Sequence, residues 1–243
     1  MIRLTRPFAL AAALSGLAGC APSNPAVQIE GILPLDAVCV ATPGELFALQ
    51  PRLDTSASSR DATVQAGPGA TPTAIRPAGI QYIAIMQVAN AITDTASRYP
   101  LMANPNAWQA EEAEVELRGI DGLPLSLPGL PSRFRVPTVG FVRSGAGVDS
   151  GRGVVPVEVI PSVYGDALAG QTGTILVATK LTGTTAGGST QTTGEYVFPL
   201  QLCDGCLFRC TPNPDMPGTQ VVVPSCLPGQ DAVSAFCLPV PPA

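Results

Sequence analysis

The pattern of apolar residues constrains the fold more than any other feature of this sequence. No stretch repeats apolar residues with the 3.6-residue period of a helix over ten or more positions. Short apolar or alternating runs are separated instead by connections rich in glycine and proline, of which the 243 residues contain 25 and 26. Alternation favours strands, and frequent glycine and proline favour turns, so the pattern predicts an all-β protein.

Seven segments are expected to form strands, and two proline positions indicate which of them lie at sheet edges. Pro137 and Pro156 place their strands at edges or bulges, because proline cannot donate a ladder hydrogen bond. Asp121-Gly122 and Ala186-Gly187-Gly188 suit hairpin turns. Residues 91–109 contain at most a short helix, which Pro100 and Pro105 interrupt. We therefore predict an antiparallel β-sandwich of seven to nine strands, with an immunoglobulin-like arrangement as one option. The predicted strands are residues 35–42, 80–89, 110–118, 134–142, 154–160, 174–184 and 192–202.

The N-terminus has the layout of an export signal. Arg3 and Arg6 precede an apolar run over residues 8–17, which is too short to span a bilayer that needs about 20 residues. Leu17-Ala18-Gly19-Cys20 then resembles the lipobox of bacterial lipoproteins. The resemblance implies that residues 1–19 are removed and that Cys20 carries a diacylglyceryl group and a further acyl chain such as palmitate. An ordinary secreted protein with a chance cysteine is the alternative.

The resemblance also implies a place in the cell. Position 21 is alanine rather than the aspartate that favours inner-membrane retention in enterobacterial lipoproteins, so we expect the outer membrane of a Gram-negative envelope. The expected organisation after the signal peptide has three parts. Residues 20–34 form the lipidated N-terminus and tether, 35–202 form the sandwich with a loop or insertion at 54–79, and 203–243 form a tail rich in cysteine and proline.

Charge and composition exclude several classes of function. Without residues 1–19 the chain has 11 basic and 18 acidic side chains and a net charge of −7. Lys180 is the one lysine and there is no basic run, so nucleic-acid binding is not expected. Histidine is absent, which removes Ser–His–Asp and Cys–His catalysis and His-ligated metals. We expect a protein that is not an enzyme and that uses no metal or cofactor.

Six cysteines remain once Cys20 is assigned to the lipid: Cys39, Cys203, Cys206, Cys210, Cys226 and Cys237. An even number in an exported protein predicts disulfides, although six cysteines allow 15 pairings. Positions beside predicted strands favour a Cys39–Cys203 bridge, with Cys206 and Cys210 pairing with Cys226 and Cys237. Two alternatives are a redox-active pair in Cys203-Asp204-Gly205-Cys206 and a zinc site made by Cys203, Cys206, Cys210 and Cys226.

The C-terminal region resembles a group of Cys-rich exported lipoproteins from high-GC Gram-negative bacteria. The resemblance rests on three segments, Phe198-Pro199-Leu200-Gln201-Leu202-Cys203, Asp204-Gly205-Cys206-Leu207 and Cys226-Leu227-Pro228-Gly229-Gln230-Asp231. It implies no assigned activity, and it supports only the general class of the protein.

Other side chains have a structural and a functional interpretation. The row Glu112, Glu114 and Glu116, with Glu111 beside it, is expected to be a solvated strand face rather than a calcium site. Arg133 and Arg135 are expected on another such face, with anion binding as the alternative. Trp108 is expected to pack in the core or at a sheet edge rather than stack on sugars.

These observations together lead to one expected function. We expect a lipid-anchored, non-catalytic binding or structural module of the cell envelope, whose partner is an envelope protein or polymer. The alternatives are a carboxylate-dependent envelope hydrolase and a thiol redox module at Cys203 and Cys206.

Overall fold

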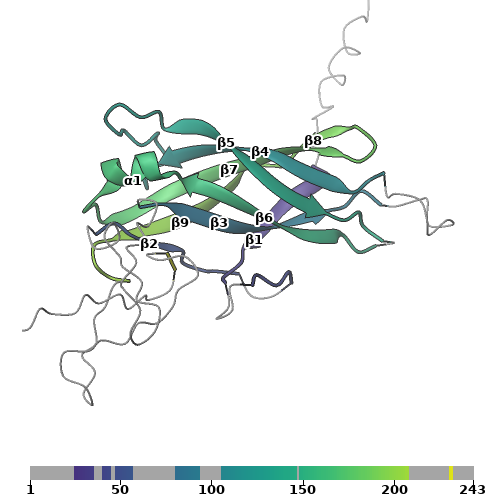
Figure 1. The fold of residues 1–243 in the computed structure, drawn as a ribbon, viewed down its shortest axis with the longest axis horizontal. Helices are drawn as coiled ribbons and strands as arrows, with labels where there is room; N and C mark the ends of the chain where they lie inside the picture. Colours follow the sequence, from purple (N-terminus) through teal and green to yellow (C-terminus); the bar gives the residue numbers. More distant parts are fainter. Residues whose placement is uncertain are drawn as a thin grey trace, which may run out of the picture.

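The computed structural model describes residues 25–35, 40–44, 47–56, 80–93, 105–146, 148–207 and 230–231. Two β-sheets face each other across one apolar core (Figure 1). The first sheet has the strand order β1-β3-β6, and the second has the order β2-β9-β7-β4-β5 with β8 paired to β7. The strands are β1 (Val27–Ile32), β2 (Arg52–Asp54), β3 (Tyr82–Asn90), β4 (Trp108–Arg118), β5 (Arg133–Val142), β6 (Gly151–Ile160), β7 (Gly173–Thr185), β8 (Thr190–Thr192) and β9 (Tyr196–Cys203).

The predicted β-sandwich is confirmed, and most of its strands lie where alternation placed them. The apolar run at 80–89 becomes β3, which is the central strand of its sheet. The alternating run at 110–118 becomes β4, with Ala113, Val115 and Leu117 buried on its inner side. The strands that contain Pro137 and Pro156 are edge strands of the two sheets, as the prolines indicated.

The core is formed by the inner faces of both sheets. Trp108, Tyr82, Met86 and Leu200 are among the side chains that are completely buried in it. Burying a large apolar side chain contributes about 1.5–3 kcal/mol, so these alternating positions determine which face of each strand turns inward. Trp108 lies in the core, which agrees with the expectation that it packs in the core or at a sheet edge.

The edge strands β5 and β6 run side by side and close one side of the sandwich. The Thr138 hydroxyl donates to the carbonyl of Pro156 at 2.5 Å, and Gly140 and Gly153 allow the two backbones to approach closely. A Cβ on Gly153 would lie 2.4 Å from the carbonyl oxygen of Phe141. The edge strands of the two sheets therefore lie against each other on this side of the sandwich.

The structure corrects the expected start of the domain. The predicted tether at 20–34 contains strand β1, because Val27 and Ile32 are buried and pair with β3. The register shifts between Ile29 and Gly31, so the alternation of this strand is broken by a bulge. The strand predicted at 35–42 is not formed by the described residues 35 and 40–42, and residues 36–39, including Cys39, lie outside the described residues.

Strand order corrects two finer predictions. The sheets are not purely antiparallel, because β2 pairs parallel with β9. The order β2-β9-β7-β4-β5 also differs from the ABED and CFG sheets of an immunoglobulin domain.

Two predicted turns are formed, with differences. Gly122 adopts φ +80° and donates to the Gly119 carbonyl, but β5 begins only at Arg133, so the connection from β4 is long. The connection at 186–188 joins β7 to β8 with Gly188 at φ +85°, and β9 then pairs with the rest of β7.

A helix that the sequence did not predict lies between β6 and β7. Helix α1 (Ser162–Leu168) follows Pro161 and buries Tyr164 and Leu168, which lie one turn apart. Tyr164 packs against Phe134 with ring centroids 4.5 Å apart, and its hydroxyl donates to the Pro131 carbonyl at 2.7 Å. Seven residues are too few to show a helical period. Among the residues that the structure describes, no helix has the length and apolar character needed to cross a membrane.

Candidate functional site

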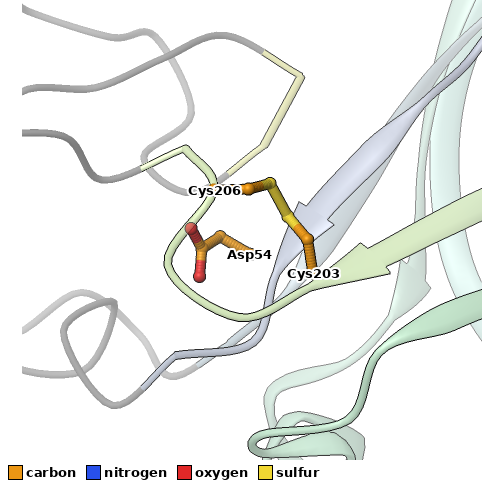
Figure 2. Close-up of side chains that lie close together, drawn as sticks. All are labelled: Asp54, Cys203 and Cys206. Atoms are coloured by element: carbon orange, nitrogen blue, oxygen red, sulfur yellow. A yellow bond between two sulfur atoms is a disulfide. The ribbon is translucent and has the colours of Figure 1, made fainter.

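The most specific side-chain arrangement lies at the end of β9, where a disulfide joins Cys203 to Cys206 beside Asp54 (Figure 2). Cys203 is the last residue of β9, and its partner across the parallel ladder is Asp54, the last residue of β2. Gly205 adopts φ +73°, which a residue with a side chain rarely does, and this lets the chain turn back within three residues. The backbone pairing of two strand ends therefore brings the carboxylate to the two sulfurs.

Asp54 holds this loop through its carboxylate. One oxygen, Oδ1, accepts hydrogen bonds from the backbone N–H groups of Ser56 and Gly205, both at 2.9 Å. The other, Oδ2, accepts from the N–H of Leu207 at 2.7 Å. Asp54 is completely buried, so these charge-assisted bonds compensate for the removal of its charge from water.

Thr55 fixes the same loop from the next position. Its N–H donates to the Cys203 carbonyl at 2.7 Å, and its hydroxyl lies 2.7 Å from the carbonyl oxygen of Gln171. The predicted loop at 54–79 is thus wrong for its first residues: Asp54 ends a strand, and Thr55 and Ser56 are buried. Residues 57–79 lie outside the described residues.

Two residues of the cysteine-rich tail complete this end of the sandwich. The Gln230 side chain pairs with the backbone of Ile83, accepting from its N–H at 2.9 Å and donating to its carbonyl at 2.5 Å. The Asp231 carboxylate accepts from the N–H of Arg52 at 2.8 Å and from the hydroxyl of Tyr82 at 2.8 Å. Because Arg52 belongs to one sheet and Tyr82 to the other, Asp231 links the two sheets.

Burial shifts the pKa values of Asp231 and Tyr82. Desolvation raises the pKa of Asp231, and the hydrogen bonds from the Arg52 N–H and the Tyr82 hydroxyl offset only part of that effect. Desolvation also raises the pKa of Tyr82, and the neighbouring Asp231 carboxylate raises it further. Both groups therefore favour their neutral forms more than they would in water.

The disulfide overturns the proposed Cys39–Cys203 bridge. Cys203 is bonded to Cys206, whose Cα lies 5.7 Å away, within the range that a disulfide spans. The pairing of Cys206 with Cys226 or Cys237 is wrong for the same reason, and the four-cysteine zinc set is not formed because two of its sulfurs are joined to each other. Cys20, Cys210, Cys226 and Cys237 lie outside the described residues.

The acidic row on β4 meets the arginines of β5. Arg135 lies 3.2 Å from Glu112, and Arg133 lies 2.9 Å from Glu116. Arg118 extends the row with a 2.6 Å contact to Glu116 and a 2.9 Å contact to Glu195. Hydrogen bonds from Arg133 and Arg118 lower the pKa of Glu116.

This ladder of ion pairs explains both predicted surface rows at once. The row of glutamates and the row of arginines face the same way on neighbouring strands, and the ladder register sets them opposite each other. The carboxylates of Glu112 and Glu116 are paired with guanidinium groups, which is unlike the oxygen cage that calcium requires.

A small cavity lies on the outer face of the three-stranded sheet. Its volume is about 250 Å³, and its lining residues are Glu30, Gly44, Phe47, Gln87 and Arg152. Glu30 is its one carboxylate and forms a 2.9 Å ion pair with Arg152. Desolvation acts to raise the pKa of Glu30, but the hydrogen bonds from Arg152 and Gln87 outweigh it and lower the pKa. A general acid would need the opposite shift.

Sequence reasoning missed Asp54, Gln230 and Asp231 as structural residues. Asp54 stands at the border of a segment rich in Ser, Ala and Thr, and the N–H groups of Ser56, Gly205 and Leu207 that bind it are backbone groups that no composition reveals. Gln230-Asp231 belongs to a segment that stands out in the sequence only through the resemblance to Cys-rich exported lipoproteins.

Comparisons with protein families, with curated proteins and with solved structures found no match.

Proposed function

We propose that this chain is an outer-membrane lipoprotein, anchored through Cys20, that serves as a non-catalytic binding or structural module of the cell envelope. The observation that carries the proposal is the Asp54-held Cys203–Cys206 loop, because its chemistry suits a permanent covalent brace. The lipobox Leu17-Ala18-Gly19-Cys20 supports the anchor and the export to an oxidising compartment.

The position of Asp54 argues against thiol exchange at this loop. A reactive cysteine needs a lowered thiol pKa, which positive neighbours or a helix N-terminus provide. Here the sulfurs follow a strand and lie beside a buried carboxylate, whose negative charge disfavours a thiolate. The described neighbours thus lack the positive groups that activate a thiol, which favours a structural disulfide over a redox-active one.

The described carboxylates give little support to the alternative of a hydrolase. Two acids with separated pKa values in one cleft would be needed. The cavity beside Glu30 supplies one carboxylate with a lowered pKa, and the carboxylates of β4 face arginines. These contacts favour a surface that binds or braces rather than one that reacts.

Intact mass measurement on detergent-extracted protein tests the proposal. Before reduction, alkylation should add nothing, and the mass should show acyl chains on a chain that begins at Cys20. After reduction, six alkyl groups should be added. An unmodified Cys20 would contradict the anchor, and alkylation of Cys203 and Cys206 without reductant would reopen the redox and zinc alternatives.

Partner capture tests the second half of the proposal. Photo-crosslinkers placed at exposed positions, such as Leu49 near β2, should give a discrete product in intact cells. A matched crosslinker at the buried position Leu200 should give none. Turnover of envelope glycans or esters by the purified protein would overturn the non-catalytic assignment.

A further inference from the structure

The two ends of the sandwich are chemically different, and the start of the described chain marks one of them. The carbonyl of Ala26 accepts from the N–H of Ala91 at 2.8 Å, at the point where β1 begins and β3 ends. The N–H of Gly145 donates to Ile92 at 2.9 Å, which places the hairpin between β5 and β6 at this same end. In Figure 1 the start of β1 and the hairpin strand β8 lie at one end, and α1 lies at the other.

The disulfide loop and the tail contacts belong to the opposite end. Tyr82, which binds Asp231, begins β3, whereas Asn90, which pairs with Val27, ends it. Cys203 ends β9, and β9 starts near the first end of the sandwich, since Gly194 approaches Pro25. The disulfide loop and Asp54 are therefore separated from the N-terminal end by the length of the sheets.

Pro25 lies only five positions after Cys20 in the sequence. A fully extended chain spans at most about 3.3–3.6 Å per residue, so this connection reaches at most about 18 Å. A lipid on Cys20 would keep the N-terminal end of the sandwich within that distance of the membrane surface. Because β1 lies within the predicted tether at 20–34, the connection from Cys20 to the sandwich is shorter than the sequence indicated. The distance from the membrane to this end of the sandwich is therefore closely limited.

The same end presents apolar side chains that the core does not use. Val139 is 67% exposed and Phe141 is 60% exposed, and they lie two positions apart on β5 and so point to the same side. Val148 is fully exposed in the turn of the β5–β6 hairpin. Arg143, which is also exposed, and Asp149 flank the turn with opposite charges, so they add no net charge to it.

We propose that Val139, Phe141 and Val148 rest in the phospholipid interface to which Cys20 anchors the chain. This inference rests on the lipidation in the proposed function. A bilayer is the occupant that the short connection to Cys20 brings within reach of this end, and aromatic and aliphatic side chains partition into the boundary between headgroups and acyl chains. The brace formed by Asp54, Cys203 and Cys206 then points away from the membrane, toward partners in the envelope.

Quenching by brominated lipid tests this orientation. The lipidated protein, with its acylation verified by mass, is placed in vesicles of phosphatidylethanolamine and phosphatidylglycerol with brominated acyl chains. Val148→Trp is compared with Leu123→Trp, a matched change at an exposed turn residue of the opposite end. Trp108 is completely buried and gives the same background in both variants.

We expect at least twofold stronger quenching for Val148→Trp than for Leu123→Trp. Equal quenching of the two, or none for either in protein that carries its lipid, overturns the inference and leaves the proposed anchor intact. A mass that shows an unmodified Cys20 instead contradicts the anchor itself. The remaining outcome is a Val148→Trp variant that is not quenched and that forms a crosslinked dimer. In that case a second copy of the chain covers Val148 in place of lipid, and the inference is also overturned.

Discussion

Replacing Asp54 with asparagine tests whether the carboxylate or the disulfide contributes more to the braced end of the sandwich. The carboxylate accepts three backbone N–H groups in a fully buried position. Asparagine has nearly the same volume but one acceptor oxygen, and its NH₂ group would face one of the three donors.

The expected loss can be estimated from these contacts. A hydrogen bond to a charged group contributes about 1.5–3 kcal/mol, and a buried donor left without an acceptor costs about 1–3 kcal/mol. Asp54→Asn retains two acceptor contacts in neutral form, so we expect a loss of about 3–4 kcal/mol in the free energy of unfolding. The disulfide closes a loop of only four residues, and loop-closure entropy gives it about 2 kcal/mol. The carboxylate is therefore expected to matter more than the covalent bond.

Urea unfolding of the oxidised chain, followed by circular dichroism, measures both effects. The variants are Asp54→Asn, the double variant Cys203→Ser with Cys206→Ser, and Asp121→Asn as a control. Asp121 accepts a single N–H, from Leu123 at 3.0 Å, in an exposed turn, so its replacement should cost less than about 1 kcal/mol. A loss for Asp54→Asn that equals the control, or that is smaller than that of the double variant, would refute this account of the brace.

Three further outcomes follow from the structure. Burial and Asp231 raise the pKa of Tyr82 above 10.0 in the folded chain, so Tyr82 ionises first in the unfolded chain. The free energy of unfolding should therefore fall as the pH rises above 10, and Tyr82→Phe should flatten that decline in thermal melts. Gly165→Ala should destabilise by about 1–3 kcal/mol or more in urea unfolding, because its Cβ would lie 2.0 Å from the backbone oxygen of Ile80, and an unchanged midpoint would contradict this packing. Glu116→Gln should cost no more than about 1 kcal/mol, and the difference from wild type should shrink in 1 M salt; a loss that is independent of salt would show that the ion pairs on β4 are not screened surface contacts.

The parts of the fold that the sequence predicts are those governed by local alternation. Glu112, Glu114 and Glu116 alternate with buried Ala113, Val115 and Leu117, so the face of the strand that meets solvent can be recognised from the sequence alone. The pairing of this row with Arg133 and Arg135 could not be recognised, because it depends on the register between β4 and β5. Alternation thus predicts each row as a strand face, whereas the partner of each row follows only from the register.

Two elements were missed for reasons that the structure makes clear. Val27 and Ile29 alternate as a strand should, but the bulge at Glu30 moves the next inward position to Ile32 and interrupts the pattern. Gly31 itself is required there, since a Cβ would lie 2.4 Å from the ring of Phe47. Helix α1 depends on Tyr164 and Leu168 meeting the core, a tertiary contact that outweighs weak local propensity.

The candidate site escaped prediction because its contacts join positions that are remote in sequence. Asp54 reaches Leu207 across 153 residues, and Gln230 reaches Ile83 across 147. Cysteine spacing suggested long-range bridges, but the disulfide that forms is local and the long-range connections are made by hydrogen bonds. The count of cysteines therefore predicted disulfides, and one forms, but between other partners than those expected.

This division between a local disulfide and remote hydrogen bonds has a consequence for the tail. Cys203 and Cys206 are three residues apart, so their bond can form before the sheets assemble, because closing a short loop requires little search. Gln230 and Asp231 can dock only after β2 and β3 are in place, since they bind Arg52, Tyr82 and Ile83. Without them the backbone of Arg52 at the edge of β2 would lose its partner, and an unpaired strand edge is a template for association with other chains. The dipeptide Gln230-Asp231 therefore acts as part of the sandwich, and the tail is coupled to the fold through it.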